Sequence, residues 1–151
     1  MEVQDIKILE AFESEKPDFN FEEMIYEVLS KLTKKDLFGL GRIELVGYSK
    51  NPNEGEEISL FYPKEKGERA YIELCIYKII DQMPEEQKKN ADHFEPHLAY
   101  ALLRGVGYNT LQFKHGVSQK KAETIAVGYA RSQFRTLYPD WEIKDGVPHK
   151  S

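Results

Sequence analysis

Apolar residues at three- and four-residue spacing mark the first regular element of the chain. Between residues 20 and 32 they recur on one helical face. The members of this stripe are Phe21, Met24, Ile25, Val28, Leu29 and Leu32. Asn20 precedes them and is a residue type that caps helix N-termini. The pattern predicts an amphipathic N-terminal helix whose apolar stripe needs a partner surface.

The next apolar segments follow patterns typical of β-strands. They read RIELVGY (residues 42–48), EISLFY (57–62) and AYIELCIYKII (70–80), separated by turn residues at 51–55 and at Lys66–Gly67. The third segment carries apolar residues on both of its faces, which predicts a central or covered strand. We therefore predict a small sheet of about three strands.

Helical patterns complete the chain. Proline suits a first helical position, so we expect one long helix to begin at Glu95–Pro96 and a second to begin near Ser118. The order helix, sheet, helix, helix predicts a single α+β domain over residues 1–141. The polar residues 142–151 predict a flexible C-terminal tail.

Composition narrows the functional classes. Of the 151 residues, 40% are hydrophobic and 31% are charged, and the formal net charge is −5. The acidic balance argues against a general nucleic-acid surface, and no apolar stretch reaches the roughly 20 residues that span a bilayer. The single cysteine, Cys75, allows no intramolecular disulfide and is expected in the core. We expect a cytoplasmic protein with neither a nucleic-acid nor a membrane partner.

A separate pattern lies between Leu98 and Ala130, where the chain reads LAYALLRGVGYNTLQFKHGVSQKKAETIAVGYA. It resembles the two active-site helices of zincin metallopeptidases. In that family an apolar helix carries HExxH, and a second helix presents a glutamate in an E-x-x-A-x-x-[FY]-A frame. The second frame is filled here by Glu123, Ala126, Tyr129 and Ala130. In length and element order the chain is closest to the small minigluzincins, so the resemblance implies a zincin-like fold with an active-site helix and a glutamate-bearing helix.

The zinc-binding residues of the first helix are absent. The HExxH frame falls on RGVGY, residues 104–108, where only Gly107 matches the family. Arg104 has only hydrogen-bond donors and stays protonated, so it cannot be a zinc ligand. Gly105 offers no general base, and Tyr108, with a phenol pKa of about 10, is a poor ligand near neutral pH. The resemblance implies a pseudoenzyme with a degenerate HExxH motif, no catalytic residue and no remaining zinc.

Glu123 leaves two alternatives open. It is either a solvated charge on an exposed helix face or a buried carboxylate that points at the former metal position. A buried carboxylate would need a countercharge. For that case we hypothesise that the Arg104 guanidinium occupies the place of the zinc and forms a structural ion pair with Glu123.

The histidines are weaker candidates. His93 and His97 in HFEPH have the i, i+4 spacing of a metal-binding pair, but Pro96 is expected to keep His93 outside the helix that holds His97. His115 is expected in the loop between the long helices, and His149 is expected in the tail. We therefore expect ordinary surface or capping roles for them.

Alternative functions remain open at this stage. The favoured one is a non-catalytic zincin-like domain that binds a peptide or protein through the retained cleft and an exposed strand edge. The second is a metal-dependent hydrolase or peptidase with a non-standard zinc site built from Glu123, His97 or His115, or a catalyst of another class in that cleft. The third is a structural or self-associating module that uses the N-terminal helix. Neither the partner nor the oligomeric state follows from the sequence.

Overall fold

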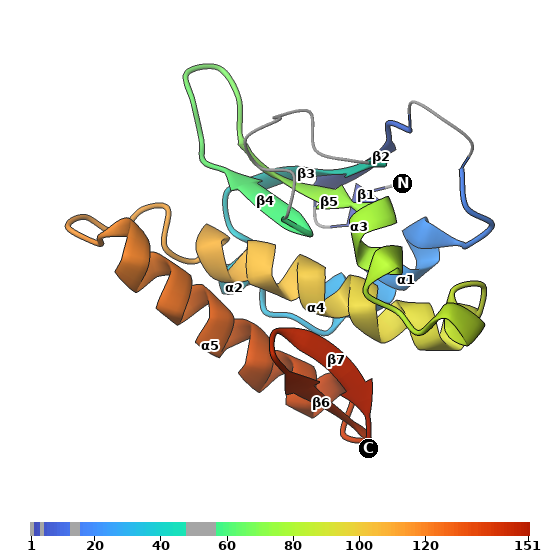
Figure 1. The fold of residues 1–151 in the computed structure, drawn as a ribbon. Helices are drawn as coiled ribbons and strands as arrows, with labels where there is room; N and C mark the ends of the chain where they lie inside the picture. Colours follow the sequence, from blue (N-terminus) through green and yellow to red (C-terminus); the bar gives the residue numbers. More distant parts are fainter. Residues whose placement is uncertain (1, 4, 13–15, 48–56) are drawn as a thin grey trace.

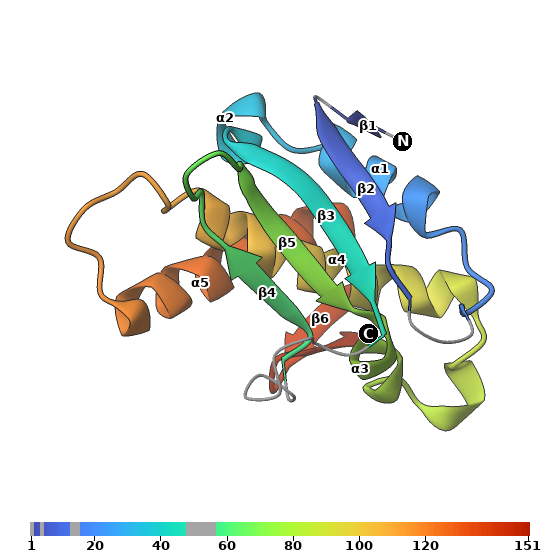
Figure 2. The same ribbon diagram turned by 90° about the horizontal axis from the view of Figure 1, so that it is seen from above.

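A mixed sheet forms one layer of the molecule. The computed structural model describes residues 2–3, 5–12, 16–47 and 57–151. Its strands are β1 (Glu2–Val3), β2 (Ile6–Glu10), β3 (Leu40–Val46), β4 (Ser59–Tyr62) and β5 (Ala70–Cys75), in the order β1-β2-β3-β5-β4. β2, β3 and β5 run parallel, whereas β1 and β4 are antiparallel to their neighbours (Figures 1 and 2). β4 therefore forms one edge of this sheet.

Helices cover one face of the sheet. They are α1 (Phe21–Ser30), α2 (Lys34–Leu37), α3 (Ile76–Asp81), α4 (Ala91–Asn109) and α5 (Gln119–Leu137), with a 3-10 turn at Glu85–Gln87. α4 lies beneath β4 and β5, and α5 packs on the far side of α4 (Figure 1). None of the described helices lies over the other face of the sheet (Figure 2). α4 is therefore the middle layer.

Alternation along the strands explains which sheet face is covered. The strand residues that belong to the hydrophobic core are Ile6, Ile8, Leu40, Ile43, Leu45, Ile72 and Leu74. Arg42 and Tyr71 alternate with them, and the Arg42 guanidinium carbon lies 3.8 Å from the centre of the Tyr71 ring. Successive side chains of a strand point to opposite faces, so one face is apolar and packs on α4 while the other carries polar and aromatic groups.

The predicted N-terminal helix is confirmed as α1. The Asn20 side chain caps it by accepting a hydrogen bond from the backbone N–H of Glu23 at 3.2 Å. Every residue of the predicted apolar stripe is buried. Phe21 meets Phe94 of α4 edge-on, with ring centroids 5.8 Å apart. The partner surface that the stripe requires is thus supplied by α4.

The α+β class is confirmed, but the predicted sheet was incomplete. All three predicted strand segments contain a strand, and β5 is central as expected. The sequence analysis missed β1 and β2, and its third strand ran too far, because Ile76–Asp81 form α3. Ile76 and Ile79 are buried one helical turn apart. The turn at Lys66–Gly67 is confirmed, with Gly67 at φ 85°, and the predicted turn at 51–55 lies outside the described residues.

α4 begins earlier than predicted. The Asn90 side chain accepts hydrogen bonds from the backbone N–H groups of Asp92 at 3.0 Å and His93 at 3.3 Å, and the helix starts at Ala91. Pro96 therefore lies inside the helix, where its missing N–H leaves one helical hydrogen bond unmade. The cap at Asn90, rather than the proline, decides where α4 starts. The second long helix begins as predicted, with Ser118 as its N-cap.

Residues 142–151 differ from the predicted flexible tail. β6 (Trp141–Lys144) and β7 (Val147–Lys150) pair as an antiparallel hairpin. Asp145 and Gly146 form its turn, both with positive φ, and Asp-Gly is a strong signal for such a turn. Trp141 packs against rings of α4, which anchors the hairpin to the helical layers.

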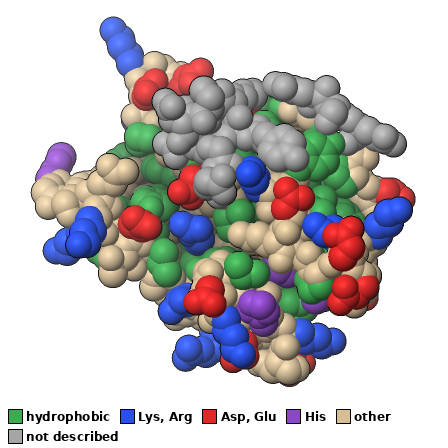
Figure 3. Space-filling view, in the orientation of Figure 1, with side chains coloured by type: hydrophobic (Ala, Val, Ile, Leu, Met, Phe, Trp, Pro, Cys, Tyr) green, Lys and Arg blue, Asp and Glu red, His purple; other side chains and the backbone are tan. Residues whose placement is uncertain are grey.

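The surface carries charges of both signs. On the face shown in Figure 3, basic and acidic side chains lie among apolar ones, and neither sign gathers into a single block in the coloured part. Within the described segments, no helix combines the length and the apolar character needed to cross a membrane.

Glycines on α4 set how closely the layers approach. A Cβ at Gly105 would lie 2.8 Å from the side chain of Ile72 in β5, and a Cβ at Gly107 would lie 2.8 Å from the backbone of Ala126 in α5. Real Cβ atoms do not come this close to other atoms, so both contacts require glycine. The missing side chains let α4 pack tightly against the sheet and against α5.

We predict opposite effects for two helical glycines. Gly107→Ala should lower the free energy of unfolding by about 1–3 kcal/mol, because the new methyl group overpacks the α4–α5 contact. Gly128 lies in α5 with no atom within 4 Å of a Cβ, so Gly128→Ala should raise stability by about 0.5–1 kcal/mol through helix propensity. Urea unfolding followed by circular dichroism measures both. Equal stabilisation of the two variants would contradict the close approach at Gly107.

Candidate functional site

Three of the four residues that the sequence analysis compared with the zincin motifs line one small cavity. It measures about 240 Å³ and lies between β4, the C-terminal half of α4 and the start of α5. Its lining residues are Glu57, Ser59, Leu60, Phe61, Arg104, Tyr108, Gln119 and Glu123. We call it the β4 cleft. The structure thus brings Arg104, Tyr108 and Glu123 together at one cavity, although two different helices supply them.

Gly105 is the position that does not line the β4 cleft. Arg104 and Tyr108 are one helical turn apart and share the cleft, whereas Gly105 faces Ile72 of the sheet. Glycine stands here because β5 lies too close for any side chain. Position 105 therefore serves the packing between α4 and the sheet.

The other positions of the second zincin frame also serve packing. Ala126 lies against Gly107, and Ala130 is fully buried in the core. The Tyr129 hydroxyl donates a hydrogen bond to the Asp36 carboxylate at 2.9 Å. Burial, together with this bond, raises the pKa of the Tyr129 phenol. Small residues at 126 and 130 thus have a structural reason that is independent of catalysis.

The hypothesised ion pair between Arg104 and Glu123 is not formed. No charged partner lies within 4.0 Å of either side chain in the part of the chain that is described. Glu123 is solvent-exposed, so the first of its two alternatives holds. A carboxylate that stays hydrated needs no countercharge, which is why the pair is not required. The Arg104 Nε atom, in contrast, is buried, and no described residue forms a hydrogen bond with it.

Tyr108 lies between these charges. Burial raises the pKa of its phenol, the Glu123 carboxylate raises it further, and Arg104 opposes part of the shift. Its ring stacks on Phe61 of β4, with centroids 6.4 Å apart and planes 12° apart. The phenol therefore stays protonated at neutral pH and offers a hydrogen-bond donor inside an aromatic wall.

The side chains of the β4 cleft do not fit zinc. A guanidinium repels a dication, and a protonated phenol does not coordinate one. Glu57 and Glu123 alone do not make the three or four protein ligands of a zinc site. Elsewhere in the described ranges, no group of three or more His, Cys, Asp or Glu residues is arranged to hold a metal ion.

His93 and His97 lie in one helix, so the prediction based on Pro96 was wrong. Their rings stack with centroids 5.4 Å apart. Trp141 of the hairpin meets the two rings edge-on, at centroid distances of 4.9 and 5.9 Å. The His97 side chain is 1% exposed, and neither of its ring nitrogens has a hydrogen-bond partner among the described residues.

Burial controls the protonation of this histidine pair. It lowers the pKa of His97 to about 4, and the nearby His93 and His149 act in the same direction. Burial, followed by the Lys150 charge, lowers the pKa of His93. His149 lies in β7 and not in an irregular tail. At neutral pH the His97 imidazole is therefore an uncharged member of the interface between α4 and the hairpin.

Cys75 and His115 lie where the sequence analysis placed them. Cys75 is fully buried at the end of β5, where burial raises the pKa of its thiol to about 12, so it is an inert core residue as predicted. His115 is exposed in the α4–α5 loop, also as predicted. Sequence reasoning missed the β4 side of the cleft, because strand order is not encoded in any local pattern.

No protein-family model, curated protein or solved structure matches this chain. Its function must therefore be inferred from the geometry of its own residues.

We predict that His97 makes the fold acid-sensitive. The unfolded histidine has a pKa of about 6.5 and the folded one about 4. Between these values the unfolded state binds more protons, so stability is complete above pH 6.5 and falls as the pH falls toward 4. The loss should be of order 3 kcal/mol.

Urea unfolding between pH 7.5 and 4.5 checks this prediction. His97→Phe keeps a ring but cannot take up a proton, so its stability should fall less steeply than that of the wild type. His115→Phe removes an exposed histidine and should keep the wild-type slope. Identical pH dependence in the wild type and His97→Phe would refute the assignment.

Proposed function

We propose that the chain is a non-catalytic, zincin-like domain that binds a peptide segment in the β4 cleft. The observation that carries this proposal is the buried Arg104 Nε, which has no hydrogen-bond partner among the residues that the structure describes. A buried donor left unsatisfied costs about 1–3 kcal/mol, so a ligand that supplies an acceptor gains affinity there. A peptide carbonyl or carboxylate oxygen is such an acceptor, and the protonated Tyr108 hydroxyl offers a second donor in the same cleft.

The edge strand supports the same proposal. β4 pairs with β5 on one side, and no strand within the described segments pairs with its other side. An extended peptide can add to such an edge through main-chain hydrogen bonds. Ser59, Leu60 and Phe61 line the cleft together with Arg104 and Tyr108. A peptide paired with this edge would lie beside both donors, the Arg104 Nε–H and the Tyr108 hydroxyl.

The zincin resemblance fits binding without hydrolysis. It implies a cleft beside the helix that carries the degenerate motif, which is where Arg104 and Tyr108 lie. Hydrolysis at this place would lack a general base, since Gly105 has no side chain. His97 and His115 do not line the cleft that holds Glu123, which weakens the alternative of a non-standard hydrolase.

Self-association through the N-terminal helix has little support. The apolar stripe of α1 is buried within the chain, and Tyr26 is its only exposed large apolar residue in the structure as described. A helix whose apolar face is already covered offers no strong dimer interface.

Removal of the Arg104 guanidinium tests peptide binding. The probes are peptides selected on the wild-type protein from a random display library, and fluorescence anisotropy gives their Kd. Arg104→Met keeps an unbranched apolar stem and removes the donors, so it should raise Kd about 10- to 100-fold. Arg135→Met, on an exposed residue in the last turn of α5, is the matched control and should leave Kd unchanged.

Hydrogen exchange locates the bound peptide. Backbone amides of β4 should exchange more slowly in the complex. The proposed site would be overturned if every selected peptide binds both Arg104 forms equally and leaves β4 unprotected.

Restoring two ligands tests the zincin-like geometry separately. The double variant Arg104→His/Tyr108→His should hold one zinc per chain, with Glu123 as the third protein ligand, whereas the wild type should hold none tightly. Gly105 is left unchanged, because a side chain there would meet Ile72. Elemental analysis after zinc loading and gel filtration measures the metal. A folded double variant without zinc would contradict zincin geometry and leave peptide binding untouched.

A further inference from the structure

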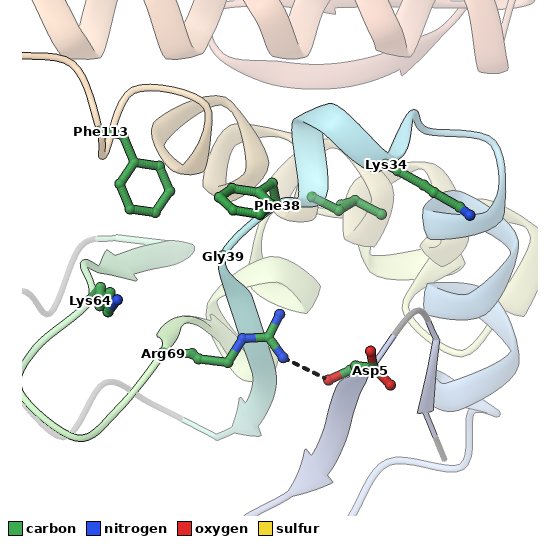
Figure 4. A pocket seen from close by; sticks show the side chains of 8 residues that line it. Asp5, Lys34, Phe38, Gly39, Lys64, Arg69 and Phe113 are labelled. Atoms are coloured by element: carbon green, nitrogen blue, oxygen red, sulfur yellow. Dashed lines mark hydrogen bonds between the residues drawn. The ribbon is translucent and has the colours of Figure 1, made fainter.

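A larger cavity lies at the end of the sheet where β2, β3 and β5 begin. It measures about 840 Å³. Its lining includes Phe38 after α2, Phe113 in the α4–α5 loop, and Lys64 and Arg69 of the β4–β5 connection (Figure 4). We call it the Phe38 pocket. Arg104 is not among its lining residues, so it is distinct from the β4 cleft.

Exposed phenylalanines form the apolar wall of this pocket. The Phe38 side chain is 69% exposed and that of Phe113 is 51% exposed. Their ring centroids are 5.7 Å apart. The other large apolar residues that are exposed in the described structure are Leu9, Tyr26 and Ile125. None of these is as exposed as Phe38 or Phe113, and a pair of exposed aromatic rings beside a hollow is typical of a binding surface.

The backbone holds the aromatic wall in place. Gly39 follows Phe38 with φ 85°, a left-handed conformation that favours glycine. A Cβ at this position would lie only 3.0 Å from the Phe113 ring. The α4–α5 loop therefore packs directly onto the turn that carries Phe38, and the contact keeps both rings at the mouth of the pocket.

Basic side chains line the same pocket as the two rings. None of Lys34, Lys64 and Arg69 has a carboxylate within 4.0 Å in the described parts of the chain. Arg69 donates a hydrogen bond to the backbone carbonyl of Asp5 at 3.3 Å instead (Figure 4). Asp5 is the one acidic residue in the lining. In a chain of net charge −5, this is a local positive field that suits an anionic partner.

We propose that the Phe38 pocket binds an acidic peptide segment that carries a large apolar side chain between its carboxylates. The apolar side chain covers the Phe38 and Phe113 rings, and the carboxylates meet Lys34, Lys64 and Arg69. Nucleic acid fits less well, because the two rings lie at 56° to each other and leave no parallel-walled slot for a base. The acidic chain would also repel a phosphate backbone.

A display selection with counter-selection tests this proposal. Random peptides are selected on the wild-type protein after depletion on the double variant Phe38→Ser/Phe113→Ser. The surviving peptides should be rich in Asp and Glu next to Phe, Trp or Leu. Anisotropy should show that Phe38→Ser and Lys64→Glu each raise their Kd about tenfold or more, and that added salt weakens binding. Ile125→Ser and Lys120→Glu, at exposed positions of α5, are matched controls and should change Kd less than about twofold.

The outcomes separate the two sites. Arg104→Met should not change the Kd of these peptides. Binding at the β4 cleft and binding at the Phe38 pocket are therefore measured independently. If the phenylalanine variants unfold, the exposed Lys64→Glu variant still decides the question. Peptides that survive depletion but are neutral or basic would overturn the proposal. It would also be overturned if no peptide survives, or if an oligothymidylate binds in a Phe38-dependent manner and acidic peptides do not.

Discussion

The approach of α4 to its two neighbours is the constraint on which the rest of the structure depends. Gly105 lets the helix press against Ile72 of the sheet, and Gly107 lets α5 lie against its backbone through Ala126. The sheet covers α4 at Gly105, and α5 covers it at Gly107. The neighbouring part of the α4 surface carries Arg104 and lines the β4 cleft. The β4 cleft is thus a part of the α4 surface that neither the sheet nor α5 covers. Its size depends on how closely β5 and α5 approach α4.

Local signals account for the elements that the sequence predicted well. Asn20 and Ser118 are helix caps followed by helical patterns, and both helices start where these residues indicate. Pro96 gave the wrong start for α4, because a proline is compatible with more than one helical position. The residue that caps the helix is Asn90, which lies before the HFEPH segment. The strands that the sequence analysis missed are short; they are β1, β2 and the two strands of the C-terminal hairpin. Such strands gain stability from their neighbours, so their own sequences predict them poorly. The Asp145–Gly146 turn was the one local sign of the hairpin.

The candidate site was predictable only in part, and for a physical reason. Spacing fixes which residues share a face of one helix, so Arg104 and Tyr108 could be placed together. Whether Glu123 pairs with Arg104 depends instead on how far α5 extends past α4 and on how much water reaches its first turns. These are properties of tertiary packing, and here they leave Glu123 exposed and the Arg104 Nε without a hydrogen-bond partner in the described part of the chain. The Phe38 pocket had no sequence signal, because four separate connections and one short helix supply its lining.

The glycine at position 105 and the close packing of α4 on the sheet are one structural fact. The zincin resemblance implies a glutamate where Gly105 stands. In this fold the Ile72 side chain occupies the space that such a residue would need, since a Cβ at 105 would already lie 2.8 Å from it. Introducing glutamate alone would force β5 away from α4 and disturb the core that both share. Accommodating a glutamate at 105 would therefore require a smaller residue at 72 as well. The packing between α4 and β5 therefore fixes the residue at 105, while Arg104 and Tyr108 of the same helix line the β4 cleft.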